Sequence, residues 1–215
     1  REKPGISKDV IAFIMVPGWV KGPREDLKES LSESKTPETE DAPAASLSPE
    51  SPFITHELVE PQHDRVINQI KHLGFGNGKE EKVKIIFVPS YLNGDDGIFN
   101  LSYYELLTGL DMTVFPSYYE PWGYTPHESI AFSIPTVTTT LAGFGVWAKK
   151  EGDKEKGISD GIEVIHRNDE NYMEVAEEIA SLIHDLTLKS AEQVETLKQS
   201  ASALLSVRSW MSEAI

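Results

Sequence analysis

Short apolar runs alternate with segments of helical periodicity along this chain, and that alternation restricts its fold more than any other feature. Continuous apolar runs are typical of strands covered on both faces, as in parallel sheets. We expect strands at Val10–Val16, which is a continuous apolar run, and at Val83–Val88, Met112–Phe115, Thr136–Thr139 and Gly161–Ile165. Their order predicts an α/β fold, in which a Rossmann-like parallel sheet with right-handed crossovers is flanked by helices.

Helical spacing of apolar residues fills the intervals between the predicted strands. We expect helices at Gln62–Leu73, Ser102–Leu110 and Thr125–Ser133, and two more within Asn168–Met211. In open parallel sheets, ligands bind beyond the carboxyl ends of the strands. The connection that follows Phe115 lies at such an end, so it is a candidate site.

Charge and cysteine content exclude several classes of protein. The formal net charge is -15 at pH 7, which argues against nucleic acid and anionic membranes as partners, because both need clustered Lys and Arg. The chain has no cysteine, so it has no disulfide and no thiolate metal site, and the sequence shows no other metal-ligand cluster. The longest apolar run, Val10–Val16, is too short to cross a bilayer. The absence of cysteine fits a cytoplasmic protein, which is what we expect.

The domain organisation follows from composition. The chain begins at Arg1 without a methionine, so we expect a piece of a longer protein. Residues 24–60 hold ten acidic and three basic residues, and Ala42–Pro52 offers little to bury. We therefore expect a flexible acidic insertion at residues 24–51. A solvated insertion is favoured over the alternative of a segment that docks a partner.

The connection from Phe115 to Glu128 is rich in aromatic residues and ends at a predicted helix start. Thr125 would cap that helix, Pro126 would take its first position, and Glu128, three residues after the cap, would complete a capping box. A helix start also binds phosphate oxygens through its free N–H groups. On that hypothesis Gly123, Tyr124 and Thr125 hold a diphosphate; a cap without a ligand is the alternative.

Glu120 and Glu128 stand on either side of this turn. Two carboxylates cannot both serve a phosphate, because like charges repel, so they are expected to face hydroxyl groups. A ligand with hydroxyls on each side of a diphosphate is a nucleotide sugar. A glycoside hydrolase would also use two carboxylates, but across a scissile bond.

A specific set of motifs surrounds the two glutamates. They are Val114–Tyr119, Glu120-Pro-Trp-Gly-Tyr-Thr-Pro-x-Glu128, Ile134–Thr139 and Gly143-Phe-Gly145, with Ile54-Thr-His56, Val83–Phe87 and Leu101-Ser-Tyr103 upstream. With them the chain closely resembles the glycogen synthases of the eukaryotic type, which are retaining glycosyltransferases of GT-B architecture. The resemblance covers residues 52–150 well. It implies that residues 1–215 form most of the C-terminal donor-binding domain and that the N-terminal acceptor domain is absent.

The resemblance also implies roles for individual residues. Glu120 falls on the carboxylate that addresses the donor glucose near its anomeric centre, and Glu128 on the one that binds the ribose hydroxyls. Tyr103 falls on the ring that stacks on the uracil. A structural role is the alternative for each: a solvated loop carboxylate, the capping box and a half-buried helical tyrosine, respectively.

Three more residues complete the implied site. Trp122 and Tyr124 would wall off the sugar, with packing as the main role of Trp122. Gly143 looks like part of the family's glycine loop near the donor sugar, and a tight connection from strand to helix explains it equally well. His56 matches a family position too, and a satisfied structural histidine is the favoured interpretation.

The implied reaction is transfer of glucose from UDP-glucose or ADP-glucose to the non-reducing end of an α-1,4-glucan, with retention and without a cofactor. The family's Arg and Lys for the departing diphosphate are expected upstream of Arg1, so this chain should be inactive alone while binding the nucleotide half of the donor. A non-catalytic nucleotide-sugar module is the runner-up. The resemblance leaves a homo-oligomeric state open.

Overall fold

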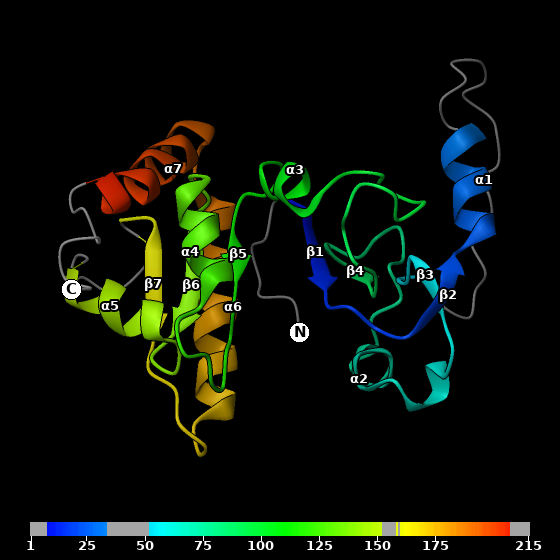
Figure 1. Cartoon of the computed structure of the whole chain (residues 1–215), viewed down its shortest axis with the longest axis horizontal. Coiled ribbons are helices and arrows are strands. Elements are labelled where there is room, and N and C mark those ends of the chain that lie inside the picture. Colours follow the sequence, from blue (N-terminus) through cyan, green and yellow to red (C-terminus); the bar gives the residue numbers. More distant parts are fainter. Residues whose placement is uncertain (1–7, 34–51, 152–157, 159, 207–215) are drawn as a thin grey trace. The chain divides into compact units, whose positions relative to one another are not determined.

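The computed structural model describes residues 8–33, 52–151, 158 and 160–206. It shows an α/β protein with parallel strands flanked by helices, as the alternation predicts (Figure 1). The chain divides into two compact units, Arg1–Tyr104 and Glu105–Ile215. The described strands belong to three sheets. That the whole chain forms one donor-binding domain stays a prediction.

Unit 1 is built around the parallel strands β1 (Val10–Met15) and β4 (Val83–Val88). On the other edge of β4, Ile54 forms a parallel bridge with Phe87. The helix α2 (Arg65–His72) follows the short 3-10 helix η1 (Pro61–His63). Apolar residues of these segments form one core: Phe53, Ile54, Leu58, Ile67, Ile70, Ile85 and Phe87.

A second sheet in unit 1 corrects the expectation of purely parallel pairing. Strands β2 (Val20–Pro23) and β3 (His56–Leu58) run antiparallel. The sequence of β2 contains glycine and proline, which strands disfavour, so its own propensity gives little signal. The partner strand supplies the pairing, which no local pattern reveals.

The helix α1 (Glu25–Glu33) occupies the first part of the segment that we expected to be flexible. Arg24, which is buried, forms an ion pair with Asp26, and its Nη1 donates a hydrogen bond to the Ile54 carbonyl at 3.1 Å. These contacts fix the start of α1 on the folded unit. The remainder of the expected insertion, residues 34–51, lies outside the described residues.

Unit 2 contains a parallel sheet of strands β5 (Thr113–Val114), β6 (Thr136–Thr139) and β7 (Ile162–Ile165), with β6 in the middle. Four helices accompany them: α4 (Tyr124–Ala131), α5 (Gly143–Glu151), α6 (Tyr172–Leu188) and α7 (Ala191–Ser206). The short helix α3 (Tyr103–Leu107) spans the division between the units.

Helices cover both faces of the β5–β6–β7 sheet (Figure 1). Ile165 and Val137 pack against α6 and α7 through Val175, Leu182 and Leu197. On the opposite side, Ile162 packs with α4 and α5 in a cluster that contains Ile130, Phe144, Ala148 and Ala201. The turn after β5 begins at the carboxyl end of that strand, where ligands bind in open parallel sheets.

Candidate functional site

The turn between β5 and α4 is held to the neighbouring connection by backbone hydrogen bonds. The Phe115 N–H donates to the Val137 carbonyl at 2.8 Å, and the Glu120 N–H donates to the Leu141 carbonyl at 3.0 Å. The Gly143 N–H donates to the Glu120 carbonyl at 3.2 Å. The backbone of Glu120 is thus fixed from both sides by the segment between β6 and α5.

The helix α4 begins two residues earlier than a capping Thr125 requires. Gly123 precedes the helix with φ 99° and ψ 72°, Tyr124 is its first residue and Thr125 its second. The Gly123 carbonyl accepts the first helical hydrogen bond, from the His127 N–H. Pro126 is tolerated within the first turn because the N–H it lacks would have no helical acceptor.

This start excludes the capping box that the sequence predicts. Glu128 is the fifth residue of α4, and no side chain accepts a hydrogen bond at the cap. The capping box that was the structural alternative for Glu128 is therefore wrong, because Gly123, in a left-handed conformation, is the N-cap in place of Thr125. The role of Glu128 toward a ribose stays a prediction.

The amino end of α4 keeps donors available for a ligand. Across the described part of the chain, the N–H groups of Tyr124 and Thr125 donate no hydrogen bond to a protein group. Both side chains are exposed, with Tyr124 at 69%. Free N–H groups at the positive end of a helix dipole attract anions, so this end suits a phosphate.

The carboxylate of Glu120 is half-buried at the start of the same turn. Its Oε2 accepts a hydrogen bond from the Ser117 hydroxyl at 3.3 Å. Glu120 also forms an isolated parallel bridge with Ala142. The side chain is consequently oriented by a partner within its own turn and is more than a solvated loop carboxylate.

Aromatic rings support the turn from the interior of unit 2. Trp122 packs edge-on against Phe144, with ring centroids 5.9 Å apart, and tilted against Trp147 at 6.4 Å. The His127 ring stacks on Phe144 at 5.1 Å, and its Nδ1 accepts a hydrogen bond from Trp122 Nε1 at 3.4 Å. The structure thus shows Trp122 as a packing residue.

The environment of His127 favours its neutral form. Burial lowers the pKa of His127 below its usual value of 6.5, and the neighbouring Glu128 carboxylate offsets part of that shift. A neutral ring is also what the hydrogen bond from Trp122 requires, because only an unprotonated Nδ1 can accept it. The sequence analysis did not single out this histidine.

Gly143 makes a close approach that a larger residue would block. A Cβ atom there would lie 2.3 Å from the Pro121 carbonyl oxygen. The tight connection between strand and helix is therefore the role that the geometry demonstrates for Gly143. Its proximity to a donor sugar stays a prediction.

Tyr103 belongs to unit 1, whereas the other predicted site residues belong to unit 2. Its N–H donates to the Leu92 carbonyl at 2.9 Å, and its half-buried ring packs edge-on against Tyr104 at 5.5 Å. That Tyr103 acts together with Glu120 and Glu128 stays a prediction.

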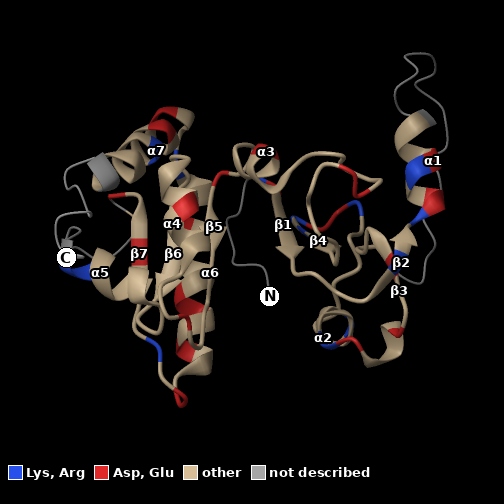
Figure 2. Ribbon diagram, in the orientation of Figure 1, with Lys and Arg blue, Asp and Glu red and all other residues tan. Residues whose placement is uncertain are grey.

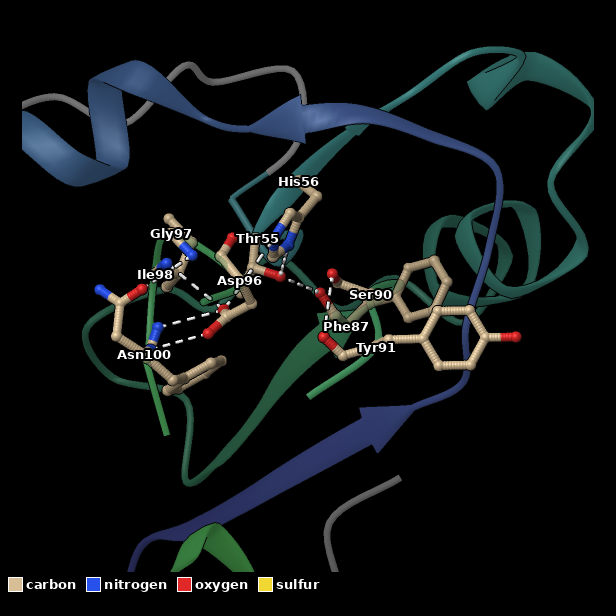
Figure 3. Close-up of polar contacts among 10 residues, drawn as sticks. Thr55, His56, Phe87, Ser90, Tyr91, Asp96, Gly97, Ile98 and Asn100 are labelled. Atoms are coloured by element: carbon tan, nitrogen blue, oxygen red, sulfur yellow. Dashed lines mark hydrogen bonds and ion pairs between the residues drawn. The ribbon is translucent and has the colours of Figure 1, made fainter. Parts of the chain in front are cut away.

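A second polar network lies in unit 1 around His56 (Figure 3). His56 Nε2 donates to the Asp96 carbonyl at 2.8 Å, and Nδ1 lies 2.8 Å from the Thr55 hydroxyl. The Asp96 carboxylate accepts hydrogen bonds from the N–H groups of Ile98, Phe99 and Asn100. His56 is a satisfied structural histidine, as expected.

Figure 2 shows acidic residues along α6, which contains four acidic residues and no Lys or Arg. The described part of the chain holds no group of three or more His, Cys, Asp or Glu that could bind a metal. None of its helices is long and apolar enough to cross a membrane.

The sequence analysis missed Arg167, which lies just after β7. This residue is 5% exposed, and its guanidinium carbon sits 3.7 Å from the centroid of the Tyr118 ring. Its Nη1 donates to the Pro116 carbonyl. The position after a predicted strand, at the edge where ligands bind, was the available signal.

Comparison with known proteins identifies the family. The family model described as "Glycogen synthase" matches residues 44–213, which is most of the chain. The chain therefore belongs to the glycogen synthase family, as its motifs indicate.

Relatives in several eukaryotes carry the same name. The chain is 32% identical over 159 residues to glycogen [starch] synthase isoform 1 of Saccharomyces cerevisiae, and 34% identical over 161 residues to glycogen [starch] synthase of Caenorhabditis elegans. Each alignment covers 74% of this chain, but only 22% and 23% of those relatives. The chain thus spans about a fifth of their length.

Two further likenesses are shorter or more remote. Over 99 residues, 46% of this chain and 14% of the relative, it is 38% identical to the liver glycogen [starch] synthase of Mus musculus. A structure of HepE from Anabaena in complex with UDP matches with a TM-score of 0.44 at 18% identity, over 95% of this chain and 46% of that chain. The latter likeness is too remote to carry an argument about ligands.

Proposed function

We propose that this chain is the donor-binding part of a glycogen synthase. The complete protein transfers glucose from UDP-glucose or ADP-glucose to the non-reducing end of an α-1,4-glucan, with retention of the anomeric configuration. The observation that carries the proposal is the amino end of α4, where two free N–H groups lie between Glu120 and Glu128 in the sequence of a family member.

The diphosphate is held at that helix end. The N–H groups of Tyr124 and Thr125 donate to its oxygens, and Gly123, whose φ of 99° favours glycine, sets the start of the helix that presents them. Gly143 keeps the neighbouring connection close enough to support the turn. The departing diphosphate also needs fixed cations, which we assign to the remainder of the protein.

The two carboxylates face hydroxyl groups on opposite sides of the diphosphate. Glu120 addresses the glucose near the anomeric carbon, and Glu128 binds the ribose. Tyr103 stacks on the base, and Trp122 and Tyr124 shield the sugar from water, which would hydrolyse the donor. The glucan acceptor binds to a domain outside this chain, and the reaction takes place in the cytoplasm without a metal or cofactor.

The test uses Glu120→Gln and Glu128→Gln in the full-length protein. We expect Glu120→Gln to lower kcat by about a hundredfold or more. Glu128→Gln should raise the KM for the donor by about tenfold, because it weakens hydrogen bonds to a charged group. Glu177→Gln, an exposed change on α6, is the matched control.

The outcomes separate the enzyme from a binding module. Full kcat in Glu120→Gln would overturn the assignment of the catalytic carboxylate. A protein that binds UDP or ADP but transfers no glucose, even before mutation, would support the non-catalytic module. Comparing UDP-glucose with ADP-glucose in the same assay identifies the base.

A further inference from the structure

We propose that Arg167 is a positioning residue for Glu120, acting through the turn Pro116–Ser117–Tyr118. The inference rests on the proposed role of Glu120. It concerns a residue that is distant in sequence from the two glutamates and that no motif of the family resemblance includes.

The contacts of Arg167 are directed at one side of this turn. Its guanidinium lies over the Tyr118 ring at 3.7 Å, with the Tyr172 ring at 5.9 Å, and its Nη1 donates to the Pro116 carbonyl. Its own N–H donates to the Thr140 hydroxyl at 3.1 Å. The side chain therefore links the segment after β7 to the turn after β5.

Arg167 lacks the partner that a buried cation usually has. Within the described residues it forms no ion pair with a carboxylate, and its Nε is buried without a hydrogen-bond acceptor. Burying a charged group without an opposite charge is unfavourable for folding. Stability alone thus does not account for an arginine here, whereas holding the turn does.

The turn transmits this support to Glu120. The Thr139 hydroxyl, on β6, donates to the Ser117 carbonyl at 2.8 Å. Arg167, which follows β7, donates to the adjacent Pro116 carbonyl. The Ser117 hydroxyl then donates to Glu120 Oε2. Displacement of this segment would change the direction of the carboxylate, while the Glu120 backbone stays fixed to Leu141 and Gly143.

The test measures kcat and the donor KM in the full-length protein carrying Arg167→Met. We expect kcat to fall about tenfold with the donor KM changed less than about twofold, because a displaced catalytic group affects the reaction more than binding. In a Ser117→Ala background the same substitution should change kcat less than about twofold, since the link is already cut. Arg65→Met, an exposed change on α2, is the control for loss of a positive charge.

A second variant, at Tyr118, tests the same link. Tyr118→Leu removes the exposed ring beneath the guanidinium and should lower kcat in the same direction, so it decides the question if Arg167→Met does not fold. A lowered thermal midpoint with unchanged kcat in the folded protein would overturn the positioning role. If the wild-type protein transfers no glucose, the proposed function fails. If Glu120→Gln keeps full kcat, the role of Glu120 on which this inference rests fails; if Glu120→Gln loses kcat and Arg167→Met does not, this inference alone fails.

Discussion

His127, in the first turn of α4 at the candidate site, makes the stability of the protein depend on pH. Its pKa is lowered by burial, so the folded protein favours the neutral form more than the unfolded chain does. Between the lowered pKa and 6.5 the unfolded chain binds more protons, and the free energy of unfolding therefore rises with pH. The stabilisation is complete above 6.5 and is lost as the pH falls through this window.

The prediction is a smaller pH dependence of stability in His127→Phe. Urea unfolding at pH about 7.5 and about 5.5 should show that the wild-type chain loses more stability than the variant, because phenylalanine keeps the ring but cannot be protonated. His72→Gln, an exposed change at the end of α2, should keep the wild-type difference. Equal losses in wild type and His127→Phe would contradict the assignment.

Gly143→Ala tests the close approach at the start of α5. The added Cβ would meet the Pro121 oxygen at 2.3 Å, and relief requires a shift of the backbone, so we expect a loss of about 1–3 kcal/mol in the free energy of unfolding. At Gly109 the nearest atom to an added Cβ is 3.4 Å away. Gly109→Ala should therefore cost much less, and similar costs for the two variants would show that the connection can relax.

At the scale of elements, the sequence predicts a helix at Gln62–Leu73, and the structure has α2 at Arg65–His72, so the predicted start is three residues too early. Asp64 caps it, with Oδ1 accepting a hydrogen bond from the Ile67 N–H at 2.8 Å. We expect Asp64→Ala to cost about 1 kcal/mol in thermal or urea unfolding. Glu60 precedes η1 without a side-chain hydrogen bond at the cap, so Glu60→Ala is the matched control. Asp64→Ala as stable as wild type would contradict the cap.

Strands with strong local patterns were predictable. The sequence predicts β6 at Thr136–Thr139 and β4 at Val83–Val88, and the structure has both at those bounds. All four residues of β6 are buried, and its Val and Thr side chains are β-branched, which favours a strand. By contrast, β2 was missed, because its four residues acquire strand geometry only by pairing with β3.

The candidate site was predictable in its position but not in its contacts. The strand order placed the turn at the carboxyl edge, and the motifs named Glu120 and Glu128. The start of α4 was predicted wrongly because a capping-box pattern and a left-handed Gly123 compete in the same segment. The roles of His127 and Arg167 depend on ring contacts with Phe144 and Tyr118, which no spacing in the sequence encodes.

At the scale of the whole molecule, the chain combines a family signature with only part of its relatives' length. Unit 2 contains the amino end of α4 and both glutamates, and Tyr103 belongs to unit 1. The cations that a departing diphosphate needs are assigned to the remainder of the protein. We therefore expect nucleotide binding by this chain to be weak but localised.

The most direct test is a titration of the isotope-labelled chain with UDP and with ADP, followed through its backbone amide signals. The account predicts saturable shifts at Tyr124 and Thr125 for one nucleotide, and weaker binding in Glu128→Gln. The Gly143 amide, already bonded to the Glu120 carbonyl, should shift less. If the signals of Tyr124 and Thr125 stay unmoved at millimolar concentrations of both nucleotides, the end of α4 is not the diphosphate site and the central claim is contradicted.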